Sequence, residues 1–96
     1  MIEPTPEQIR VEGQLRMRRA LELIERAQND LASACAELST LEGAVPVWNT
    51  CNKLTDKVHA FWHRVNLFRN GGRFKLDSIH IDSLRRRLNA TQEITR

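Results

Sequence analysis

The sequence is poor in the residue types that cross-link a chain or interrupt its helices. Its 96 residues include no tyrosine, two cysteines, three prolines and four glycines, and aromatic residues make up 5% of the chain. Two cysteines cannot build a disulfide framework, so the fold has to rest on a mostly aliphatic core. The longest uninterrupted apolar run, from Ala44 to Trp48, is far shorter than the roughly 20 residues of a membrane-spanning helix.

The beginning of the chain also lacks the features of a secretory signal. Met-Ile-Glu-Pro-Thr-Pro provides neither a basic segment nor an apolar one. Hydrophobic residues make up 41% and charged residues 28% of the sequence, which is typical of a folded domain. We therefore expect one cytoplasmic domain, residues 1–96, that does not engage a membrane.

Apolar residues spaced three and four apart predict a long first helix, at about residues 6–42. Thr5 is placed as its N-cap, Pro6 suits the first helical position, and Gln8 sits where a capping-box side chain reaches back. Gly43 is a natural terminator. Alanine at every second core position favours close approach of another helix. The predicted core stripe is Met17, Ala20, Ile24, Ala27, Leu31, Ala34, Leu38 and Leu41.

A second helix is predicted from Pro46, over about residues 46–70. Its core stripe has the same alternating spacing, and the sequence Asn70-Gly71-Gly72 ends it. A β-hairpin through Asn70-Gly71 is the alternative, which we rank lower because residues 65–69 continue the helical period. The predicted stripe is Cys51, Leu54, Val58, Phe61, Val65 and Phe68.

A third helix is predicted at about residues 77–93. Asp77 is a good N-cap, while Leu76 and Ile81 are placed to form a hydrophobic staple across the helix start. Leu84 and Leu88 extend the core face from Ile81. A short linker makes the first two helices antiparallel neighbours, so the expected fold is all-α: a long antiparallel helical hairpin plus a shorter third helix, forming a three-helix bundle.

The unequal helix lengths predict self-association. The first helix would overhang the second by roughly 15–20 Å at 1.5 Å per residue. Either the helix breaks at Gly13 and folds back, or a second subunit covers the overhang, and we expect a homo-oligomer. The apolar residues of the overhang are Ile9, Val11, Leu15 and Met17.

Charge is unevenly distributed along the chain. Residues 1–48 carry five Arg and eight acidic residues, whereas residues 49–96 carry ten Lys/Arg and four acidic residues, which together give the net charge of +3. A basic half points to an acidic partner such as nucleic acid or an acidic protein surface, although a solvated helix face is equally basic. The predicted basic patch is Lys53, Lys57, Arg64, Arg69, Arg73, Lys75, Arg85, Arg86 and Arg87.

One flank of the second helix carries tryptophan and histidine. Such a flank can bind a protein partner, because tryptophan is enriched at the energetic centres of interfaces, or it can stack on nucleic-acid bases. The structural alternative is that each tryptophan covers the edge of the core. The predicted partner-binding residues are Trp48, His59, Trp62 and His63.

Metal and thiol chemistry are weakly indicated. His59 and His63 have the i, i+4 spacing of two metal ligands on one helix, but the residues between them do not complete a zinc-protease motif. We therefore expect no metal site and no cofactor. Cys35 and Cys51 flank the predicted turn almost symmetrically, so we expect two small buried thiols near each other, with a disulfide open to them in an oxidising compartment.

No arrangement of residues predicts catalysis. Asp77-Ser78-Ile79-His80 contains the residue types of a catalytic triad, but these positions read better as a helix start. Asn70-Gly71-Gly72-Arg73 lacks the Lys-Ser/Thr of a phosphate-binding loop. We therefore expect a non-enzymatic helical adaptor or inhibitor that acts through a macromolecular partner. The alternative is a nucleic-acid-binding protein that uses the basic second half, from Lys53 to Arg87.

Overall fold

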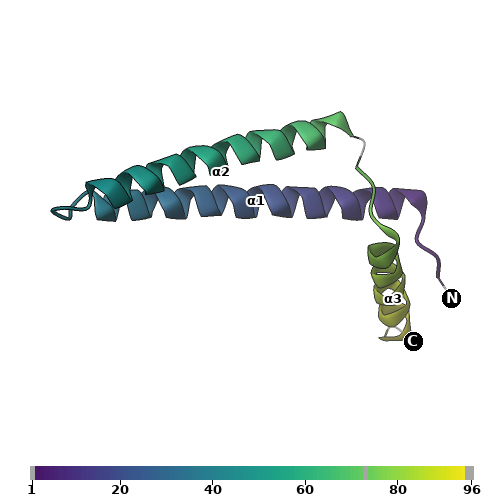
Figure 1. Ribbon diagram of the computed structural model, residues 1–96. Helices are drawn as coiled ribbons and strands as arrows, with labels where there is room; N and C mark the ends of the chain where they lie inside the picture. Colours follow the sequence, from purple (N-terminus) through teal and green to yellow (C-terminus); the bar gives the residue numbers. More distant parts are fainter. Residues whose placement is uncertain (1, 73, 95–96) are drawn as a thin grey trace.

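Three helices make up the protein in a computed structural model, which describes residues 2–72 and 74–94. They are α1 (Pro6–Leu38), α2 (Val45–Gly71) and α3 (Ser78–Ile94), and no strand occurs within these residues. Helices α1 and α2 form an antiparallel hairpin, and α3 lies at its open end (Figure 1). The predicted all-α class, with a long helical hairpin and a shorter third helix, is confirmed.

The predicted capping box begins α1. The Thr5 hydroxyl accepts a hydrogen bond from the Gln8 N–H at 3.1 Å, and the Gln8 side chain accepts one from the Thr5 N–H at 2.8 Å. These two bonds satisfy amides that the first helical turn leaves without partners.

Helix α1 ends at Leu38, earlier than the predicted boundary near residue 42. The Ser39 hydroxyl donates to the Ala36 carbonyl at 2.6 Å, and the Thr40 hydroxyl donates to the Glu37 carbonyl at 2.7 Å. Side chains thus satisfy carbonyls that a longer helix would have bonded through its backbone. Gly43, with a φ of +80°, then reverses the chain before α2 begins.

The N-terminal end of α1 does not break. Gly13 lies inside the continuous helix, is buried, and packs against the Phe74 ring, which would lie 3.6 Å from a Cβ at this position. On the register of the Cys35–Cys51 and Gln28–His59 contacts, the end of α2 at Gly71 lies level with residue 15 or 16 of α1, so α1 extends about 14 Å beyond α2 at 1.5 Å per residue, near the predicted overhang. The predicted break at Gly13 does not occur, because the segment after α2 packs against this end, and cover by a second subunit stays a prediction.

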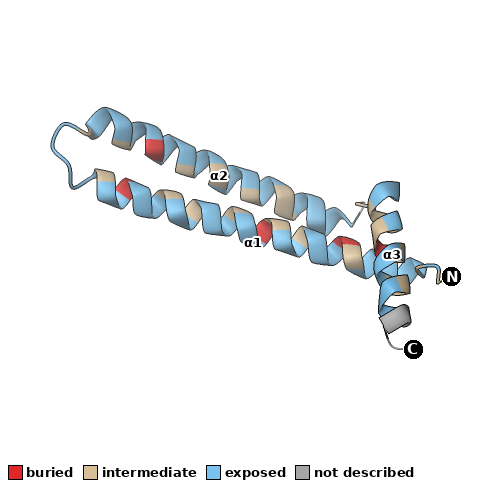
Figure 2. Ribbon diagram, turned by 90° about the horizontal axis from the view of Figure 1, so that it is seen from below, coloured by how far each residue is buried: buried red, intermediate tan, exposed pale blue. Residues whose placement is uncertain are grey.

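Between α1 and α2 runs a seam of side chains that holds the hairpin together. Leu21 and Cys35 of α1 are buried, and Ile24, Gln28 and Leu31 are half-buried (Figure 2). The predicted stripe is correct at Met17, Ile24, Leu31 and Leu38, which are half-buried, whereas Ala27, Ala34 and Leu41 are exposed. The helix is turned so that the larger side chain of each apolar neighbouring pair, such as Leu21 beside Ala20, enters the seam. Burying the larger side chain removes more apolar surface from water.

Helix α2 is turned in the same way. The predicted core residues Leu54, Phe61 and Phe68 are 47%, 52% and 54% exposed. The predicted flank residues Trp48 and Trp62 are half-buried instead and lie in the seam together with Thr55. The complete α2 side of the seam is Trp48, Cys51, Thr55, Val58, Trp62 and Val65.

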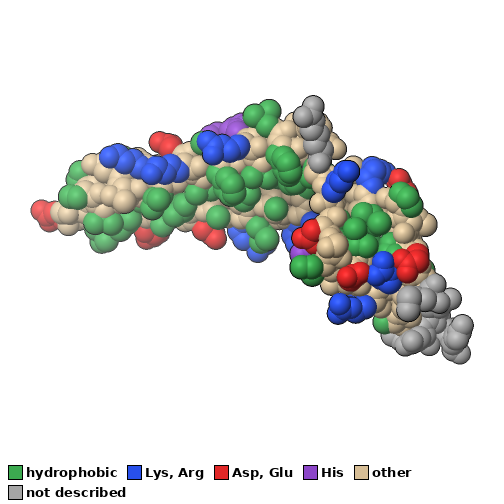
Figure 3. Space-filling view, turned by 45° about the vertical axis from the view of Figure 1, so that its right-hand side comes forward, with side chains coloured by type: hydrophobic (Ala, Val, Ile, Leu, Met, Phe, Trp, Pro, Cys, Tyr) green, Lys and Arg blue, Asp and Glu red, His purple; other side chains and the backbone are tan. Residues whose placement is uncertain are grey.

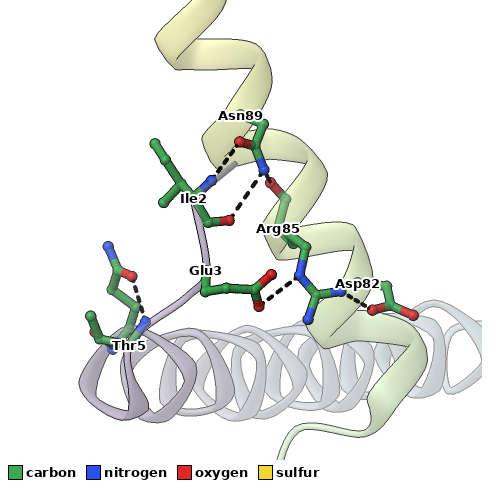
Figure 4. Close-up of polar contacts among 7 residues, drawn as sticks. Ile2, Glu3, Thr5, Asp82, Arg85 and Asn89 are labelled. Carbon is green, nitrogen blue, oxygen red and sulfur yellow. Dashed lines mark hydrogen bonds and ion pairs between the residues drawn. The ribbon is translucent and has the colours of Figure 1, made fainter.

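Helix α3 lies across the N-terminal end of α1 and fixes the first residues of the chain. The Asn89 amide bonds both the N–H and the carbonyl of Ile2, at 2.8 and 3.2 Å, and Arg85 Nε donates to Glu3 at 2.9 Å (Figure 4). Asp77 caps the helix as predicted, accepting from the His80 N–H at 2.9 Å. Leu84, which is buried, is the apolar anchor of α3.

The seam predicts that truncating a buried leucine lowers the free energy of unfolding more than truncating an exposed leucine. Leu21→Ala removes a side chain that is 5% exposed and should lower the free energy of unfolding by about 2–5 kcal/mol. Leu67→Ala removes one that is 72% exposed and should cost less than about 0.5 kcal/mol. Urea titrations followed by far-UV circular dichroism measure both. Equal losses in the free energy of unfolding for the two variants would contradict the position of the seam.

Candidate binding surfaces

A continuous apolar surface lies beside the seam along one side of the hairpin. In each helix its residues repeat every seven positions, about two helical turns, and lie roughly 80° round the helix from the centre of the seam. Because the two helices are antiparallel, the same rotation on each brings both rows to one side. We call this surface the apolar face: Ala20, Ala27 and Ala34 of α1, with Val47, Leu54, Phe61 and Phe68 of α2.

Little of the chain covers the apolar face. Helix α3 lies at the open end of the hairpin and runs away from the hairpin, so α3 does not cover the length of the two long helices (Figure 1). Phe74 closes only the end of the face, with its ring centre 5.9 Å from that of Phe68. Apolar side chains gather along the hairpin in the space-filling view (Figure 3).

A cleft of about 790 Å³ lies at the open end, between α1, the end of α2 and the segment that leads to α3. The apolar part of its lining, which we call its floor, includes Phe74, Leu76 and Ile81. The predicted overhang residues Ile9, Val11 and Leu15 line it, while Met17 lies half-buried in the seam. The structure therefore brings three of the four predicted self-association residues together around this cleft.

Four cationic side chains border the cleft: Arg10, Arg18, Arg69 and Lys75. Arg10 donates to Glu7 through Nε at 3.0 Å, and this hydrogen bond lowers the pKa of the Glu7 carboxyl. Arg18 lies 3.3 Å from Glu22. Arg69 and Lys75 form no ion pair with any described residue, so the α2 side of the cleft is the more available to an anion.

The tryptophans and histidines of α2 divide between two environments. Trp48 and Trp62 are half-buried in the seam, and the Trp62 Nε1 atom is buried with no described hydrogen-bond partner. His59 and His63 are exposed on the side away from the apolar face. The half-burial of both tryptophans agrees with the packing alternative, in which they cover the edge of the core.

The two histidines contact each other. Their Nε2 atoms are 3.0 Å apart, and His59 Nδ1 lies 2.9 Å from the Gln28 side-chain nitrogen. Edge-on ring contacts link His63 to both His59 and Trp62, with centroids 4.5 and 5.2 Å apart. Within residues 2–72 and 74–94, no third histidine, cysteine or carboxylate joins them in a cluster able to hold a metal ion.

The predicted basic patch is distributed over separate elements. Lys53, Lys57 and Arg64 are exposed along α2 and form no ion pair among the described residues. Arg69 and Lys75 lie at the cleft, and Arg73 falls outside the described residues. Helix α3 carries the remaining three arginines at the end of the hairpin.

Two of the α3 arginines hold the N-terminal part of the chain. Arg85 binds Glu3 and, through Nη1 at 2.5 Å, Asp82, while Arg87 binds Glu12 at 2.7 Å. Arg86 is exposed. The hydrogen bonds to Glu3 and Asp82 raise the pKa of Arg85. These pairs give the arginine run a structural role that the sequence alone does not indicate.

The two cysteines meet in the seam near the turn, as expected from their symmetrical placement. Cys35 Sγ donates to Cys51 Sγ at 2.7 Å, both thiols are free, and both side chains are buried. This hydrogen bond is the largest cause of a raised pKa at the Cys51 thiol, and burial adds to it. A raised pKa favours the neutral thiol, so the pair fits the predicted packing role.

Comparisons with known proteins give no relative: no family model, curated protein or solved structure matches the chain. No helix in the described part of the chain is long and apolar enough to cross a membrane. Function therefore has to be inferred from the surfaces themselves.

The half-burial of Trp62 predicts a stability defect when it is truncated. Trp62→Ala should lower the free energy of unfolding towards the lower end of the about 3–5 kcal/mol typical of a buried tryptophan. Thermal and urea denaturation measure this cost. A variant as stable as the wild type would instead favour Trp62 as an anchor for a partner.

Proposed function

We propose that the protein is a non-enzymatic helical binding protein, an adaptor or inhibitor that acts through a macromolecular partner and as a homo-oligomer. The observation that carries this proposal is the apolar face, on which Leu54, Phe61 and Phe68 remain about half exposed. A cytoplasmic location without membrane contact is part of the proposal.

The size of the apolar face supports an interface. The side of the hairpin that carries the apolar face is about 40 Å long and 20 Å wide, from 27 residues at 1.5 Å each and two helix diameters, so its footprint with the polar rim is roughly 800 Å². Single proteins rarely expose apolar patches larger than a few hundred Å² unless the patch binds something. About 800 Å² per partner is also the standard size of a specific protein interface.

The residues around the cleft support binding rather than catalysis. Its described lining consists of apolar side chains, glycines, the amides of Gln14 and Asn70, and Arg and Lys side chains. It includes no carboxylate, imidazole, hydroxyl or thiol, the groups that usually transfer protons or attack substrates. An apolar floor with a cationic border suits an acidic, partly apolar segment of a partner.

Affinity capture from a lysate of the source cells tests the proposal. Tagged wild type and tagged Leu67→Asp, which alters an exposed residue outside the apolar face, should retain the same protein, with or without nuclease. Phe61→Asp should retain at least tenfold less, because it places a charge in the centre of the apolar face. Mass spectrometry identifies what is retained. If the two aspartate variants retain equal amounts of the protein, the apolar face is not the surface that binds it.

Direct nucleic-acid binding is the second candidate, favoured by the exposed, unpaired row of Lys53, Lys57 and Arg64. If this row contacts phosphates, binding to a random duplex at about 50 mM salt should weaken steeply as salt rises, because counterions are released. Reversing all three residues to Glu should abolish it and leave Arg85 and Arg87 in their ion pairs. Fluorescence anisotropy measures both effects, and no binding at low salt would exclude this candidate.

A further inference from the structure

We propose that the apolar face binds a second copy of this chain, forming a four-helix bundle in which α1 of each copy lies against α2 of the other. Both turns then lie at the same end of the bundle, and the two-fold axis runs along it. This inference rests on the proposed function and names the partner at its apolar face.

The register of the hairpin fixes which residues lie level with one another. Cys35 lies beside Cys51, with 2.7 Å between the sulfurs, and Gln28 lies beside His59 at 2.9 Å. Because the helices are antiparallel, each residue nearer the start of α1 lies level with a residue nearer the end of α2. On this register each alanine of the apolar face lies within about two residues, or 3 Å, of the level of a large α2 residue. The level pairs are Ala34 with Leu54, Ala27 with Phe61, and Ala20 with Phe68.

Side-chain size favours packing α1 against α2 of the second copy. Such packing sets each small α1 residue opposite a large α2 residue, as with Ala27 opposite Phe61 of the second copy. Alternating large and small residues fill the space between helices without voids. The other two-fold arrangement packs α1 on α1 and α2 on α2, which sets alanine against alanine and phenylalanine against phenylalanine.

Charge at the rim of the apolar face favours the same arrangement. Three positions after Ala27 and Ala34 of α1 lie the acidic residues Asp30 and Glu37. Three positions after Leu54 and Phe61 of α2 lie the basic residues Lys57 and Arg64. All four are exposed, and none forms an ion pair with another described residue. Packing α1 on α2 of the second copy brings opposite rims together and places Asp30 level with Lys57 of the second copy. Packing like helices together would oppose like charges.

The small core of a single chain makes a second copy the fitting occupant. Among the residues whose burial the structure describes, the buried hydrophobic ones are Leu21, Cys35, Cys51 and Leu84, and none of these is fully enclosed. A two-fold dimer covers the two-helix footprint of about 800 Å² on each copy, the area a stable dimer needs. Because the two faces are identical and self-complementary, no other surface has to be supplied.

Molecular mass in solution is the first test. Light scattering after size-exclusion chromatography should give about twice the chain mass of 11.1 kDa at tens of micromolar. Phe61→Asp should halve the observed mass, and Leu67→Asp should leave it unchanged, while circular dichroism checks that both remain helical. Leu15→Asp, at the cleft, should also leave the dimer intact. A monomeric wild type, or a dimer broken by Leu15→Asp and not by Phe61→Asp, would overturn the proposal.

Cross-linking between two single variants tests the arrangement. Asp30→Cys and Lys57→Cys proteins are mixed, equilibrated and treated with a short bis-maleimide. The mixture should give a covalent dimer several-fold above that of either variant alone, because residue 30 lies beside residue 57 only across the interface. Wild type, whose cysteines are buried, is the blank. A covalent dimer of equal yield from Asp30→Cys alone would show α1 packed on α1 and overturn the arrangement.

Failure of this inference is distinguishable from failure of the proposed function. A monomeric wild type that still captures a different protein from lysate, and loses it in Phe61→Asp, would exclude the second copy and retain the binding function. A monomer that captures nothing through this face would contradict both.

Discussion

The seam between α1 and α2 is the contact on which the other features of this protein depend. Two helices packed only on each other can bury one narrow stripe each, and here the stripes contain Leu21, Cys35 and Cys51 as their buried members. Apolar residues outside these stripes have no place in a two-helix core. Because apolar residues occupy most of three positions in each seven-residue repeat, with Gln28 and Thr55 as polar exceptions, one row on each helix is left outside. The apolar face is thus a direct consequence of a hairpin that lacks covering helices.

Helix α3 does not supply that cover, and its polar contacts show why. Arg85 and Arg87 bind Glu3 and Glu12, and Asn89 bonds the backbone of Ile2, so the helix is tied to the start of the chain. Exposed ion pairs contribute little to stability, typically 0–1 kcal/mol each. Their effect here is to define where α3 lies. Phe74 and the cleft floor add the apolar contact that joins α3 to the open end of the hairpin.

The sequence predicts the local features of this fold well, because they depend on neighbouring residues. Thr5 with Gln8, Asp77 with His80, and the glycines at 43 and 72 act through short-range hydrogen bonds and backbone preferences. The choice between Ala20 and Leu21, or between Phe61 and Trp62, depends on how far each helix rotates about its axis. Both members of each pair are apolar, so periodicity cannot decide it. The cleft and the pairing of Arg87 with Glu12 join residues distant in sequence, and no local signal predicts them.

A two-fold dimer of the proposed kind has a consequence for the cleft. Phe74 separates the cleft from the apolar face, packing against Phe68 on one side and Gly13 on the other. Covering the face therefore leaves the clefts of both copies accessible. With both turns at one end, both clefts lie at the opposite end of the bundle, each bearing Arg69 and Lys75, which form no ion pair with a described residue. Two cationic, apolar-floored sites at one end can engage two acidic segments of the same assembly, and linked sites bind more tightly than either site alone.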